Sequence, residues 1–73
     1  MDATAEYHRS LAQAIALIAL IHGRTEELNR KEKADWGDVG DAGALREDLL
    51  KAAGRAFGRP DINLPDALKL TIH

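Results

Sequence analysis

The sequence predicts an all-α protein, in which a long helix and a shorter helix form an antiparallel hairpin with a docked C-terminal tail. Two observations predict this class. Apolar residues recur at helical spacing over residues 4–33 and again over residues 41–57. Between these segments, residues 34–41 are rich in glycine and aspartate, which interrupt helical periodicity.

The first helix is expected over residues 4–33 because its apolar residues alternate in steps of four and three, the a/d pattern of a helix seam. The seam consists of Tyr7, Leu11, Ala14, Ile18, Ile21, Thr25 and Leu28. Ile15, Leu17 and Leu20 add apolar surface beside it, so the middle of the helix must be buried on several sides. Gly23 costs about 1 kcal/mol relative to Ala and marks a kink, a close crossing or a break.

The second helix is expected over residues 41–57, with Asp41 as its N-cap and Asp38 as a rival. Its inner stripe is predicted to contain Ala42, Leu45, Leu49, Ala52, Ala53 and Ala56, widened by Leu50 and Phe57. Gly58 occupies the position of a left-handed C-cap, and Pro60 prevents continuation of the helix. The tail, residues 59–73, is too apolar to remain in water. Pro65 favours a short helix there, whereas the alternation around Leu68, Leu70 and Ile72 favours a strand.

The chain has 73 residues and is expected to form a single domain, residues 1–73. The first helix would be roughly 40 Å long and the second about 24 Å, so one hairpin leaves much of the first helix uncovered. With no cysteine to form disulfides, a second copy is the expected source of extra stability, giving a dimeric four-helix bundle. The predicted oligomer interface contains Leu11, Ile15, Ile18, Ile21 and Leu28.

Composition and motifs argue against several function classes. The net charge of −2 and the pI near 5.8 make direct nucleic-acid binding unlikely. The apolar stretch from Leu11 to Ile21 is too short for a membrane span. We find no nucleophile with a neighbouring base and no phosphate-binding glycine loop, so we expect no enzyme activity, no catalytic residues, no metal and no cofactor. A cytoplasmic location is expected.

The acidic connection around Trp36 is the most distinctive feature of the sequence, because Glu32, Asp35, Asp38 and Asp41 recur every three residues. Their spacing differs from that of a calcium-binding EF-hand loop. They either contact a basic protein partner, or Asp38 and Asp41 cap the second helix and the other two are solvated. Trp36, the only tryptophan, either anchors a partner or plugs the end of the hairpin. The candidate partner-binding residues are therefore Asp35, Trp36 and Asp38.

Two histidines on the first helix, His8 and His22, lie equally far from Ile15. One chain cannot bring both to one metal ion, because fourteen residues of helix span about 21 Å. If two copies crossed antiparallel at Ile15, His8 of one chain would approach His22 of the other. The alternative is two partly exposed histidines without a shared role.

Residues 34–41, with the sequence ADWGDVGD, and the following Leu45-Arg46-Glu47 resemble a pattern in small bacterial and phage proteins of no assigned activity. The resemblance covers about a third of the chain. It implies an accessory protein of a phage or other mobile element, a class that includes small acidic inhibitors of host defence such as anti-CRISPR proteins.

These observations favour a non-enzymatic protein–protein interaction module, an adaptor or regulator, that acts as a homodimer. The alternative is a mobile-element inhibitor that blocks a basic nucleic-acid-binding surface with its carboxylates. A DNA-binding regulator would need a concentrated basic face, which the sequence lacks.

Overall fold

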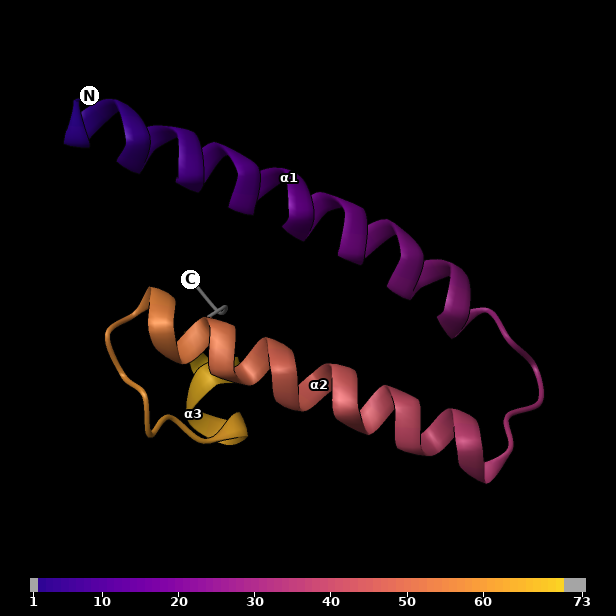
Figure 1. Cartoon of the computed structure of the whole chain (residues 1–73). Coiled ribbons are helices and arrows are strands. Elements are labelled where there is room, and N and C mark those ends of the chain that lie inside the picture. The colour runs from indigo at the N-terminus through magenta and orange to yellow at the C-terminus, as the bar shows by residue number, and fades with distance from the viewer. Residues whose placement is uncertain (1, 71–73) are drawn as a thin grey trace. The chain divides into compact units, whose positions relative to one another are not determined.

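A computed structural model describes residues 2–70, and within this range it contains three α-helices and no strand (Figure 1). The predicted all-α class is confirmed. The chain divides into two compact units, residues 1–33 and residues 34–73, which we describe separately. The single domain, the antiparallel hairpin and the dimeric bundle stay predictions.

The first unit consists of α1 (Ala3–Asn29). Asp2 caps its start, because the Thr4 backbone N–H donates to the Asp2 carboxylate over 3.0 Å. The helix runs through Gly23 without a break. It ends at Asn29 and not at residue 33 as predicted. Just after Asn29, the backbone N–H groups of Arg30 and Lys31 donate to carbonyls only three residues back. These shorter-range bonds tighten the last turn and close the helix.

The second unit begins with α2 (Trp36–Ala56), so the predicted start at Asp41 is wrong. Asp35 is the N-cap and forms a reciprocal capping box with Asp38. The Asp38 backbone N–H donates to the Asp35 carboxylate over 2.8 Å, and the Asp35 N–H donates to the Asp38 carboxylate over 3.0 Å. These two bonds satisfy amides that the first turn of a helix leaves unpaired. The helix therefore starts ahead of Gly37, Gly40 and Gly43 and includes all three.

The C-terminus of α2 closes as the sequence predicts, with Gly58 in the left-handed conformation at φ +66°. The Gly58 N–H donates to the Arg55 carbonyl over 3.3 Å, and the Arg59 N–H donates to the Gly54 carbonyl over 2.7 Å. This pair of bonds is the Schellman motif, which turns the chain back toward the helix it has just left.

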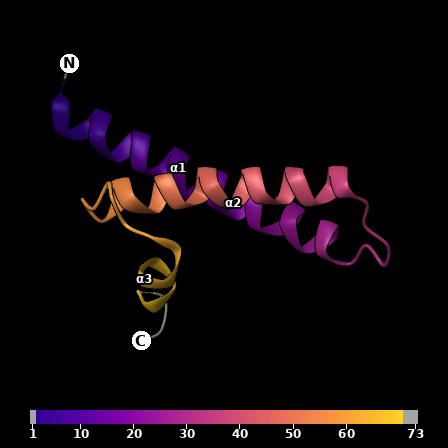
Figure 2. The same ribbon diagram turned by 90° about the horizontal axis from the view of Figure 1, so that it is seen from below.

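The tail forms a third helix, α3 (Leu64–Lys69), which lies beside the C-terminal half of α2 and packs on it (Figures 1 and 2). Asn63 is its N-cap and accepts a hydrogen bond from the Asp66 N–H over 2.9 Å. Pro65 lies in the first turn, where its missing N–H costs nothing. Over these residues the helical alternative is confirmed and the strand is excluded. Ile72 lies outside the described residues.

In the second unit, the buried Gly54 of α2 lies close to Ile62, which is only 8% exposed. A Cβ atom on Gly54 would lie 2.7 Å from the Arg59 carbonyl oxygen and 3.2 Å from the Ile62 Cγ2 atom. Only glycine allows the returning chain to come so close. The residues that are half-buried on α2 and α3 include Leu50, Ala53, Leu64 and Ala67. Leu49 and Phe57 of the predicted inner stripe remain exposed.

Candidate protein-binding surfaces

The apolar surface of α1 is the largest candidate site, because this helix of 27 residues has no buried residue. Its middle exposes Ile15, Ile18 and Leu20 at 67%, 64% and 69% of their surface. Within the predicted interface set, Leu11 and Leu28 are also exposed, whereas Ile21 is half-buried. Large apolar side chains gathered on one exposed helix are typical of a surface that binds another protein.

Leu17 and Leu20 lie outside both the seam and the predicted interface, and both are more than half exposed. The seam residue Tyr7 is also outside the predicted interface and is 63% exposed. Leu17 lies at a g position beside the seam and Leu20 at a c position farther from it, and a strict a/d pattern leaves both positions out. The apolar surface is therefore wider than the seam, and it is widest in the middle of the helix.

Polar and charged side chains of α1 pair locally along the helix. Arg9 contacts Glu6 over 3.1 Å, His22 contacts Glu26 over 3.0 Å, and Arg24 contacts Glu27 over 3.1 Å. All of these pairs are exposed and contribute little to stability. The His8 ring packs edge-on against Tyr7, with ring centroids 5.4 Å apart.

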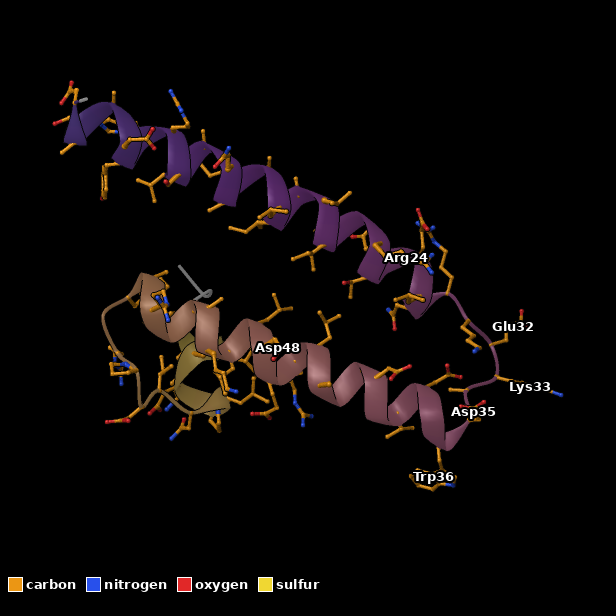
Figure 3. The ribbon with its side chains drawn as sticks, viewed as in Figure 1. Arg24, Glu32, Lys33, Asp35, Trp36 and Asp48 are labelled. Carbon is orange, nitrogen blue, oxygen red and sulfur yellow. The ribbon has the colours of Figure 1, made fainter. Side chains whose placement is uncertain are left out.

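The second candidate site is the first turn of α2, where Figure 3 shows the Trp36 ring projecting away from the helix. Trp36 is 86% exposed, the highest value among the large apolar residues described. Its ring, with Ala34, Asp35 and Val39, lines a shallow depression of the surface. An exposed indole beside a second apolar side chain suits a protein contact, since Trp is a frequent anchor of interfaces.

The structure places Asp35 and Asp38 beside Trp36, but both carboxylates are engaged in the capping box. Of the two predicted caps, Asp38 takes part in capping α2, whereas Asp41 is exposed inside the helix. The N-cap itself is Asp35, which was not predicted as a cap. Of the two capping-box residues, Asp35 also borders the depression that the Trp36 ring lines.

Between residues 2 and 70, no three His, Asp or Glu side chains come close enough together to hold a metal ion. No helix in this range combines the length and the hydropathy that a membrane crossing requires. Lys51 and Arg55 border a second shallow depression with Pro60. The guanidinium of Arg59, the residue before Pro60, lies 4.0 Å from the carboxylate of Asp66 in α3.

No protein family, curated protein or solved structure matches this chain.

Proposed function

We propose that this chain is a small non-enzymatic interaction module that assembles with itself through α1 and engages a protein partner through the Trp36 region. The observation that carries the proposal is the exposure of Ile15, Ile18 and Leu20 on a helix that has no buried residue. Covering these side chains is favourable by roughly 25 cal/mol for each Å² removed from water, so α1 gains most by associating.

Self-assembly is tested by light scattering at micromolar concentration. We expect about twice the mass of 8.0 kDa, and the apparent mass should fall toward one chain on dilution. A monomer that melts cooperatively over the same concentration range would contradict assembly, because it would show that one chain covers its own apolar surface.

For the partner, we propose a protein with a basic surface. Residues 34–73 hold seven of the twelve Asp and Glu residues but only five of the ten Lys and Arg residues. The whole net charge of −2 therefore lies in the unit that presents Trp36. Such charge attracts a basic partner over long range and less strongly at high salt, while the indole supplies the short-range contact.

The partner site is tested by affinity capture from native cells with the wild-type chain and the Trp36→Ala variant as matched baits. A partner of this site should be retained by the wild type, be lost with the variant and dissociate as salt rises. Equal recovery on both baits would remove Trp36 from the contact. Because this residue is exposed, its substitution tests binding without disturbing the fold.

A further inference from the structure

The residues on either side of the α1 seam, its two flanks, indicate how two copies would pair. One flank contains His8, Ile15 and His22, and the other contains Ser10, Leu17 and Arg24. These residues are the e and g positions of the heptads whose a and d positions form the seam. Each flank therefore has one large apolar residue at its centre and polar residues on either side.

Orientation follows from what each flank would meet. In a parallel pair the two flanks face each other, so Ile15 would lie against Ser10 of the partner and Leu17 against the partner's His22. In an antiparallel pair each flank meets its own copy. Ile15 then lies against the partner's Ile15, and Leu17 against the partner's Leu17. Only the antiparallel arrangement places apolar side chains against apolar side chains on both sides of the seam.

The register follows from the ends of the helix. Full overlap sets Ala3 of one copy level with Asn29 of the other, which are the two ends of α1. In this register Leu11 meets the partner's Ile21. Sliding by one heptad in either direction leaves Tyr7 or Leu28 beyond the end of the partner helix.

The same register matches residues by size. Ala14 lies level with the partner's Ile18, and Thr25 lies level with the partner's Tyr7, so each small side chain faces a large one. A seam that alternates in this way fills space without voids. Heptad alignment, overlap and size matching thus agree on one arrangement.

A second copy is also the occupant that charge favours. Residues 1–33 contain five Lys and Arg residues and five Asp and Glu residues, so this unit has no net charge. Two copies of this first unit can approach each other without net repulsion, whereas two copies of the acidic second unit would repel each other.

We infer that α1 pairs with α1 of a second copy in an antiparallel, fully overlapping register, with Ile15 and Leu17 meeting their own copies on either side of the two-fold axis. This inference rests on the proposed self-assembly and specifies its geometry.

Cysteine cross-linking tests the register, since the chain has no cysteine of its own. In the inferred pair, Ser10 of one copy and Arg24 of the other lie on the same flank, about 3 Å apart along the axis. Within one helix they are about 21 Å apart and cannot form a disulfide. The double variant Ser10→Cys with Arg24→Cys should therefore shift to a covalent dimer on mild oxidation. Each single variant, the matched control, should stay mostly uncross-linked.

A second variant, Leu17→Cys, should cross-link to its own copy, which a parallel pair or a slipped register would not allow. Circular dichroism and light scattering on the reduced variants verify that helix content and mass are unchanged. A dimeric mass without either cross-link would overturn the register and leave self-assembly intact. A monomeric wild-type chain would overturn both.

Discussion

The 34–73 unit encloses Ile62 against Gly54 of α2, whereas α1 encloses none of its side chains. The difference arises from chain reversal. After α2, Gly58 turns the backbone so that Ile62 and α3 return onto the helix that precedes them. Residues 1–33 contain no second element that could do the same.

The two regions therefore depend on different sources of stability. The second unit has contacts within its own sequence, although they are few. Within its own unit, α1 has the hydrogen bonds of the helix, the Asp2 cap and a few exposed side-chain pairs. A helix without tertiary packing is marginal in water. We therefore expect the apolar residues of α1 to be covered by association, and the following substitutions test this difference between the two units.

The largest effect is expected from Ile18→Asp. If the seam is covered, this change places an unpaired charge in an apolar contact, which is expensive. The variant should lose the dimeric mass in light scattering or lose most of its helix signal in circular dichroism. The control is Gln13→Asp, away from the seam, which should keep both. Unchanged mass and melting for Ile18→Asp would mean that nothing covers this surface.

Gly54→Ala should destabilise the second unit by about 1–3 kcal/mol in a urea melt, because the new Cβ atom would meet the Arg59 carbonyl oxygen at 2.7 Å. The control is Gly40→Ala in the same helix, where a Cβ atom meets nothing within 4 Å. That change should stabilise by up to about 1 kcal/mol through helix propensity. Two variants of equal stability would argue against the close contact with Ile62.

Asp35→Ala should lower the free energy of unfolding by about 1 kcal/mol, since it removes the N-cap of α2. Asp41→Ala removes the same charge from an exposed position inside the helix, and we expect it to be neutral or slightly stabilising. A larger loss from Asp41→Ala than from Asp35→Ala would return the start of the helix to the originally predicted position.

Trp36→Ala should have the smallest effect on folding, within about 0.5 kcal/mol, because its ring is 86% exposed. Thermal melting of the variant measures this directly. A loss of several degrees would show that the indole packs against the protein, as in the alternative in which it plugs the end of a hairpin.

Helix type could be predicted from the sequence, whereas helix boundaries could not be predicted as well. The periodicity of α1 correctly gave a long helix, and Gly23 did not interrupt it because one residue weighs little among 27. For α2, the three glycines led to a predicted start at Asp41, although Asp35 and Asp38, spaced by three residues, indicate an earlier start. That pair was visible in the sequence, and it predicts a capping box when each side chain is matched to the other's amide.

The contact between Gly54 and Ile62 could not be predicted from spacing alone. It depends on the path that the chain takes after Gly58, and periodicity contains no information about such a return. For the tail, the sequence left a helix and a strand open, but it contains local signals that favour the helix. Asn63, Pro65 and Asp66 are a cap, a first-turn proline and a first-turn acid, a combination that favours a helix over the alternation of the later residues.

The exposed position of Trp36 has a practical consequence. The chain contains one tryptophan, in the second unit, and one tyrosine, Tyr7, in α1. Each unit therefore contains its own natural fluorophore. Indole emission shifts to shorter wavelength when water leaves the ring, so a blue shift would report a partner arriving at Trp36. The fluorescence anisotropy of Tyr7 would increase when α1 pairs with α1 of a second copy, because the assembly tumbles more slowly. The emission wavelength of the indole thus reports a partner at Trp36 without a label, whereas anisotropy reports any increase in the size of the assembly.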